Sequence, residues 1–324
     1  MTDTDTTTSS EWDGVVGTVT LGATAGEGGT RTVSYRIGGD LGLPYTGAPR
    51  PGEHQPLIVY EICDDPSIWS PLVRNAVGDL VNDPGDWAAA AEKTYRADMV
   101  RLVLTSTRRR GFDDFSSVNR TVEQVLASTS FPLAIEGPNE PAIESEVFQR
   151  CGEVGQGERL LLGTAEAARY RSVAAAALTY HHAMIAQSPI DINLAKQLNI
   201  LLREVGVPAN QIVIDPYTGA LGYGFEYSYS AMERIRYAAL RGDTDLAMPM
   251  ICAAGDTLNV KEIRDASGAD QDQMAIRWEV YTCLAAAIAG AAVLCVRHPG
   301  SVPVLRQALD ALWVARQEVD VDGT

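Results

Sequence analysis

The sequence predicts an α/β protein whose main domain is a single parallel (β/α)8 barrel, a TIM barrel. Eight short apolar runs alternate with helical patterns, and their starts lie roughly 25 to 45 residues apart, a spacing typical of strand–helix units. The runs lack a strict alternation of polar and apolar residues, as is common for strands that are buried on both faces. Good helix-start signals fall between the runs.

The eight apolar runs are the predicted barrel strands. They cover residues 56–62, 98–106, 132–137, 159–163, 183–188, 211–216, 245–252 and 291–296. Asp83 before Pro84 is an N-cap signal, because proline favours the first helical position. Ser188 before Pro189 gives the same signal after the fifth run, and Asp191 would then be the acid of a capping box.

A β-hairpin is expected before the barrel. Residues 15–23 and 31–39 alternate polar and apolar side chains, and a glycine-rich turn over 26–29 joins them. The chain therefore divides into a disordered tail (1–13), the hairpin with a Pro/Gly linker (14–55), the barrel (56–317) and an acidic tail (318–324).

Composition excludes several functions. The net charge of −16 argues against nucleic-acid binding, because phosphates would be repelled. The longest apolar run, 280–296, is rich in alanine and is expected to be a buried helix leading into a strand rather than a membrane span. The first residues have neither the basic nor the apolar part of a signal peptide, so a cytoplasmic protein is expected.

Several barrel chemistries lack the residues that they need. None of the three lysines follows a strand closely, which excludes a Schiff-base aldolase. The five cysteines show no CxxC pair and the four histidines are scattered, so no metal or iron–sulfur site is expected on this chain. The carboxylates Glu61, Glu136 and Asp215 end predicted strands and remain candidates either for acid–base chemistry or for structural roles.

In a TIM barrel the functional residues follow the strands. The most distinctive such segment is the glycine loop, Thr218–Tyr223, within the stretch IDPYTGALGYGFEYS. Its glycines permit positive φ and leave backbone groups uncovered, so the loop can lie flat against a large planar partner or simply connect a strand to a helix. The candidate binding residues are Asn139, Gln187, Asn193, Asp215, Thr218, Gly219, Gly222 and Tyr223.

Long motifs resemble one known family. The stretches IAQSPIDINLAKQLNILLREVGVP (185–208), IVIDPYTGALGYGFEYSYSAMERIRYAAL (212–240) and LAMPMIC (246–252) closely resemble the small (delta) subunit of the corrinoid iron–sulfur protein of the acetyl-CoA decarbonylase/synthase system. The resemblance extends to LLLGTAEAARYRSVAAAALTY (160–180) and, more loosely, to residues 58–64 and 97–107.

The resemblance implies a fold and a role. The family fold is a TIM barrel related to dihydropteroate synthase and to pterin-binding methyltransferases. The small subunit pairs with a large (gamma) subunit that carries an iron–sulfur cluster, and a cobamide lies between them. The cobamide carries a methyl group from a methyltetrahydropterin to acetyl-CoA synthase in the reductive acetyl-CoA pathway, with transient contacts to a methyltransferase and to the synthase. The small subunit is then a scaffold and cap for the cobamide rather than a catalyst.

Two other hypotheses stay open. A stand-alone pterin-dependent methyltransferase would hold the pterin with Glu136, Asn193 and Asp215. A barrel that has lost ligand contact would serve interaction alone. The sequence also departs from the expected family pattern at EGPNE (136–140), and the run Arg108–Arg110 has no assigned role at this point.

Overall fold

The computed structural model describes residues 12–46 and 53–319. Eight parallel strands close into one barrel in the order β3-β4-β5-β6-β7-β8-β9-β10, which confirms the predicted TIM barrel. The strands are β3 (Leu57–Cys63), β4 (Met99–Val103), β5 (Leu133–Glu136), β6 (Leu161–Ala165), β7 (Ala183–Gln187), β8 (Ile212–Asp215), β9 (Met250–Ala253) and β10 (Ala291–Val296). Each of the eight apolar runs overlaps one of these strands.

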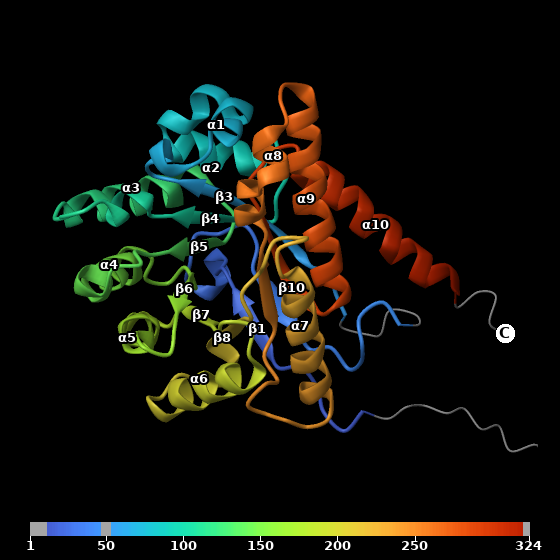
Figure 1. The fold of residues 1–324 in the computed structure, drawn as a ribbon. Helices are drawn as coiled ribbons and strands as arrows, with labels where there is room; N and C mark the ends of the chain where they lie inside the picture. Colours follow the sequence, from blue (N-terminus) through green and yellow to red (C-terminus); the bar gives the residue numbers. More distant parts are fainter. Residues whose placement is uncertain (1–11, 47–52, 320–324) are drawn as a thin grey trace, which may run out of the picture.

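Helices surround the barrel (Figure 1). They are α1 (Pro71–Val77), α2 (Pro84–Lys93), α3 (Phe115–Ser128), α4 (Pro141–Val154), α5 (Tyr170–Tyr180), α6 (Ile192–Glu204), α7 (Phe225–Leu240), α8 (Lys261–Asp265), α9 (Ala269–Ile288) and α10 (Ser301–Val319). Short 3₁₀ helices are η1 (Ala25–Glu27), η2 (Pro66–Ile68), η3 (Gly78–Asn82), η4 (Thr105–Arg108), η5 (Ala209–Gln211) and η6 (Gly255–Asn259). Within the described part of the chain, no helix has the length and apolar character needed to cross a membrane.

One of the two predicted helix starts is confirmed and the other is corrected. Asp83 caps α2 through its side chain, which accepts hydrogen bonds from the backbone N–H groups of Gly85 and Asp86. The helix expected to begin at Pro189 instead begins at Ile192. Asp191 is itself the N-cap and accepts hydrogen bonds from the backbone of Asn193 and Leu194. Ile190 has φ of 56°, outside the helical region, which delays the start of the helix.

The predicted hairpin closes the amino-terminal end of the barrel. Strands β1 (Thr18–Leu21) and β2 (Tyr35–Gly38) pair antiparallel, and η1 occupies part of the expected glycine turn. Val19, Leu21 and Ile37 pack onto the inward side chains of the barrel. Because backbone bonds from the hairpin region reach residues just before β6 and β9, the open end of the barrel is the opposite, carboxyl-terminal end.

His182 lies just before β7, at the amino-terminal end, where packing or solvent exposure is expected. Its ring is fully buried: Nδ1 accepts a hydrogen bond from the Leu160 backbone N–H at 3.2 Å, and Nε2 donates to the Gly152 carbonyl at 3.0 Å. Both nitrogens are therefore satisfied in the neutral form. Burial lowers the pKa of His182 below its ordinary value of 6.5.

This burial predicts an acid-sensitive contribution to stability. Because the folded-state pKa of His182 is lowered, the contribution is fully present above about pH 6.5 and is lost as the pH falls through the lower folded value. We expect the contribution of His182 to the free energy of unfolding to fall by about 1 kcal/mol between pH 7.5 and 5.5, measured by urea denaturation as the difference between the unmodified chain and His182→Gln. His182→Gln should remove this part of the pH dependence. The control His181→Asn, at an exposed neighbour, should keep it, and equal slopes in the two variants would contradict the assignment.

Candidate binding site at the carboxyl-terminal rim

A polar cavity, here called the charged well, opens at the carboxyl-terminal end of the barrel. Its volume is about 310 Å³. It is lined by Glu61, Arg101, Val103, Arg108, Glu136, Asn139, Thr164, Glu166, Gln187, Asp215, Tyr217, Thr218, Ala253, Gly255, Asp256 and Arg297. Most of these side chains stand on the last inward position of a strand or on the loop that follows it.

Strand register places opposite charges next to each other. Glu61 on β3 and Arg101 on β4 are direct cross-strand partners. Arg101 Nη1 donates to Glu61 Oε1 at 2.9 Å, and Nη2 donates to Glu136 Oε2 at 2.6 Å. One buried guanidinium therefore bridges two carboxylates from two neighbouring strands. Such a bridge is stable only when both ends are hydrogen-bonded, because an isolated buried charge is costly.

Two more arginines extend the ion-pair network. Arg297, just after β10, pairs with Glu61 at 2.9 Å and lies over the Trp69 ring, 4.4 Å from its centre. Arg108 pairs with the second oxygen of Glu136. A Cβ at Gly255 would lie 2.5 Å from Glu61 Oε2, so any larger residue there would displace this pair. Charges thus alternate around one side of the well.

The network shifts the pKa values of Glu136 and Arg101. Burial raises the pKa of Glu136, but Arg101 and Arg108 outweigh burial and leave that pKa below its ordinary value. Burial also lowers the pKa of Arg101, yet Glu136 and Glu61 raise it above the usual range. Glu136 is therefore a poor candidate for a general acid or base near neutral pH.

Gln187 and Asp215, at the ends of β7 and β8, form a hydrogen-bonded pair in the well. Gln187 Nε2 donates to Asp215 Oδ2 at 2.8 Å, and the backbone N–H of Tyr217 donates to Asp215 Oδ1 at 2.8 Å. Burial raises the pKa of Asp215 despite these bonds. Asn139, after β5, and Thr218, after β8, also line the well. The well therefore offers both donors and acceptors without an excess of positive charge.

The run Arg108–Arg110 now has a structural explanation. Arg108 joins the well through Glu136, and Arg109 pairs with Asp65 in the loop after β3. Asp65 in turn caps η2 by accepting a hydrogen bond from the Ser67 backbone N–H. The first two arginines thus tie the loops after β3, β4 and β5 together.

The glycine loop, Thr218–Tyr223, borders the well and faces solvent. The Gly219 backbone N–H donates to Ser228 Oγ at 2.9 Å, and the Tyr223 hydroxyl donates to Glu262 Oε2 on α8 at 3.0 Å. The Tyr223 side chain is nevertheless 55 % exposed, and Tyr217 just before the loop is 48 % exposed. The loop is held in place from behind while its aromatic side chains remain available.

An apolar shelf adjoins the well on the side of α6. It is a second cavity, of about 380 Å³, that shares Glu166, Gln187 and Tyr217 with the well. Its remaining lining residues are Ala167, Ala168, Ser188, Pro189, Leu194 and Leu198. The rim therefore combines a polar depression, an apolar shelf and the exposed glycine loop.

The structure separates the predicted site residues into three groups. Asn139, Gln187, Asp215 and Thr218 come together in the well. Gly219, Gly222 and Tyr223 lie beside it in the glycine loop. Asn193 is not among the lining residues of the well: it is an exposed residue in the first turn of α6, where its backbone N–H donates to Asp191.

The sequence did not indicate that three arginines of the well belong to one ion-pair network. They are Arg101, Arg108 and Arg297. A signal existed for Arg101, because it interrupts the apolar run of β4 two residues after Met99, which points into the barrel. Residues two apart on a strand share a face, so Arg101 had to point inward as well.

The fold defines the class of protein. Dihydropteroate synthase from Xanthomonas albilineans superposes with a TM-score of 0.55 at 18% identity, covering 81% of this chain and 93% of that chain. The enzyme from Thermus thermophilus gives a TM-score of 0.55 at 17% identity over 90% and 98% of the two chains. At this identity the likeness shows a shared fold, the dihydropteroate-synthase type of TIM barrel.

Sequence comparison then gives the family. Residues 18–305 match the family described as CO dehydrogenase/acetyl-CoA synthase delta subunit, and the chain belongs to this family. "Acetyl-CoA decarbonylase/synthase complex subunit delta 2" of Methanosarcina acetivorans is 34% identical over 96% of this chain and 74% of its own length. The delta subunit of Archaeoglobus fulgidus is 32% identical over 93% and 69%, respectively.

Proposed function

We propose that this chain is the small subunit of a corrinoid protein and that its carboxyl-terminal rim covers a cobamide held with a large partner subunit. The cobamide would carry a methyl group between a methyltetrahydropterin and acetyl-CoA synthase, and the iron–sulfur cluster would belong to the partner. Family membership supports this role, because the relatives are named as delta subunits of the acetyl-CoA decarbonylase/synthase complex.

The observation that best supports the proposal is the shape and polarity of the rim. The well, the shelf and the glycine loop together make a broad surface with an apolar part and a polar part. A corrin ring is a large macrocycle with amide groups around its edge, so it would lie across this surface rather than inside a well of about 310 Å³. Asn139, Gln187 and Thr218 are suited to hydrogen bonds with such amides.

The histidines and cysteines of this chain fit a covering role. His182 and His298 are buried within the protein, and His181 and His54 lie at or before the amino-terminal ends of strands. No histidine therefore lines the well, and a lower ligand for cobalt would have to come from elsewhere. All five cysteines are buried, and no metal-binding cluster of histidine, cysteine and carboxylate residues occurs among residues 12–46 and 53–319.

The ion pairs also favour a role in binding the cobamide over a catalytic role. Glu61 and Glu136 are both paired with Arg101, and Arg101 with Arg108 holds the pKa of Glu136 below its ordinary value. The rival hypothesis, a stand-alone methyltransferase, needs Glu136, Asn193 and Asp215 to converge on one pterin. Asn193 does not line the well and Glu136 is bound by two arginines, so this set of residues is not assembled.

Co-expression tests the proposed function. The chain should co-purify in equal amounts with a candidate large subunit that carries a four-cysteine cluster motif, and the complex should show the visible absorption of a corrinoid. Each subunit alone should retain much less corrinoid. A purified chain that by itself methylates free cobalamin from a methyltetrahydropterin would favour the methyltransferase instead. A stable complex without corrinoid would support an interaction-only barrel and contradict the proposal.

A further inference from the structure

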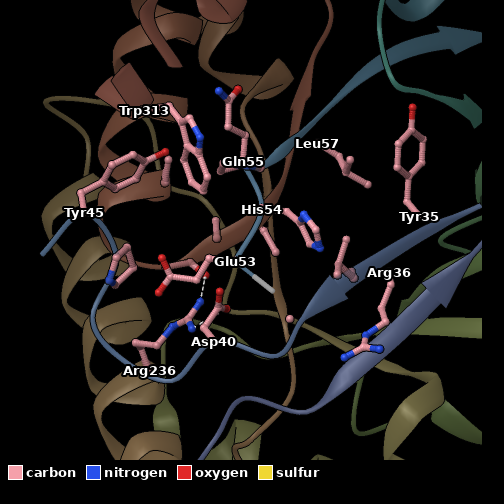
Figure 2. A pocket seen from close by; sticks show the side chains of 18 of the residues that line it. Tyr35, Arg36, Asp40, Tyr45, Glu53, His54, Gln55, Leu57, Arg236 and Trp313 are labelled. Carbon is pink, nitrogen blue, oxygen red and sulfur yellow. Dashed lines mark hydrogen bonds and ion pairs between the residues drawn. The ribbon is translucent and has the colours of Figure 1, made fainter. Parts of the chain in front are cut away.

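A separate cavity lies at the amino-terminal end of the barrel, opposite the rim. Its volume is about 460 Å³, within the range of small-molecule sites. Its walls come from β2, residues 40–45 and 53–57, the carboxyl ends of α7 and α9, the start of β10, and α10 (Figure 2). We call it the amino-end cavity. It shares no residue with the charged well.

The lining is apolar and aromatic at its centre. Ile37 and Leu57 are buried side chains of the hairpin and the first barrel strand, and Ala287, Ala291 and Ala292 add small apolar surfaces. Three aromatic side chains, Tyr35, Tyr45 and Trp313, stand around the cavity (Figure 2). Aromatic walls around a small apolar floor suit a planar ring, which can stack on one face and contact edges on the other.

A fixed ion pair lies at one side of the cavity. Arg236 is buried, and its Nη1 donates to Asp40 at 2.6 Å while its Nη2 donates to the Gly290 carbonyl at 2.7 Å. Its Nε has no acceptor among the described residues. A Cβ at Gly290 would lie 2.6 Å from that Nε, and φ there is +108°, so this approach requires glycine. The guanidinium is therefore held in one orientation.

The charges of the lining nearly balance. The two arginines Arg36 and Arg236 are matched by the two carboxylates Asp40 and Glu53. A strongly charged ligand would be attracted by either the arginines or the carboxylates and repelled by the other group. A neutral ligand with donors and acceptors could form hydrogen bonds with both groups.

We propose that the amino-end cavity binds a neutral, planar nitrogen heterocycle of nucleoside size. The aromatic walls and small apolar floor accommodate the ring, and the paired charges accept and donate hydrogen bonds at its edges. This site is independent of the proposed corrinoid role, because the two surfaces lie at opposite ends of the barrel. Binding there requires no partner subunit.

Titration of adenosine into the full chain, followed by isothermal calorimetry and saturation-transfer NMR, tests the proposal. Saturable binding at one site is expected, with a Kd on the order of 0.1 mM, as is usual for a ligand of about 19 non-hydrogen atoms. Trp313→Ala removes one wall and Ala292→Leu fills the floor. Each should weaken binding about tenfold, or about 1.4 kcal/mol, the upper end of the range for one aromatic stacking contact.

Controls separate this site from others. Tyr223→Ala, at the opposite end, should leave adenosine binding unchanged, and thermal melting should show that all variants are folded. The absence of saturable binding would overturn the proposal. Binding that survives in both Trp313→Ala and Ala292→Leu, or adenosine monophosphate binding about tenfold more tightly than adenosine, would overturn it as well, because the site would then lie elsewhere or select charge.

Discussion

Replacing Arg101 by methionine is expected to lower the free energy of unfolding by about 3–5 kcal/mol. Arg101 is 3 % exposed. Its guanidinium nitrogens lie 2.9 Å from a carboxylate oxygen of Glu61 and 2.6 Å from one of Glu136. Methionine fills similar space but removes the positive charge, so two carboxylates at the barrel mouth lose their shared partner. The cost arises because Glu61 and Glu136, both in the rim network, then keep only Arg297 and Arg108, respectively, as partners. Urea denaturation at neutral pH measures it.

Two further variants show whether the cost has this origin. Arg120→Met breaks a pair with Asp114 in which both side chains are more than half exposed, and it should cost less than about 1 kcal/mol. A double-mutant cycle of Arg101→Met with Glu136→Gln should give a coupling energy of about 0.5–3 kcal/mol, because the two side chains form one ion pair. If Arg101→Met lowered the free energy of unfolding as little as Arg120→Met does, the bridge would not be important for the stability of the rim.

The double variant Gly219→Ala with Gly222→Ala should lower corrinoid retention by about tenfold or more in the complex with the large subunit. A Cβ at Gly219 would lie 3.0 Å from the Gly224 carbonyl carbon, and Gly222 has φ of +74°, which other residues rarely adopt. Both changes therefore move the glycine loop. The proposed contact surface depends on that position, and the ratio of corrinoid absorbance to protein in purified complex measures the effect.

A matched glycine provides the control for backbone strain. Gly206, between α6 and η5, has φ of +101° and open space where a Cβ would stand. Gly206→Ala should cost stability through its backbone but should leave corrinoid retention unchanged, because this turn precedes β8 at the other end of the barrel. Equal loss of corrinoid in both variants would assign the effect to general destabilisation.

The fold could be predicted because its signals are local. Each buried strand is a short apolar run, and Asp83 before Pro84 marks a helix start by its own chemistry. The predicted start of α6 is three residues too early, because the positive φ of Ile190 depends on tertiary packing rather than on a local signal. Asn193 stands in the first turn of this helix and outside the well.

The charged well could be predicted only in part. Asp215 and Gln187 are recognisable as polar residues at strand ends, and the structure brings them together. The bridge from Glu61 through Arg101 to Glu136 depends on which residues face one another across β3, β4 and β5. That register is a property of the closed barrel, so the sequence alone shows three carboxylates without showing that arginines neutralise two of them.

Site-specific photocrosslinking tests the central claim most directly. A benzophenone amino acid in place of Tyr223, which is 55 % exposed in the glycine loop, should crosslink to the large subunit in the assembled complex. The same group in place of Tyr281 is the matched control, because that tyrosine is 58 % exposed but lies about 18 Å along α9 from its start. The account predicts a strong crosslink at position 223 that fades when the complex lacks corrinoid. A crosslink only at position 281 would contradict it.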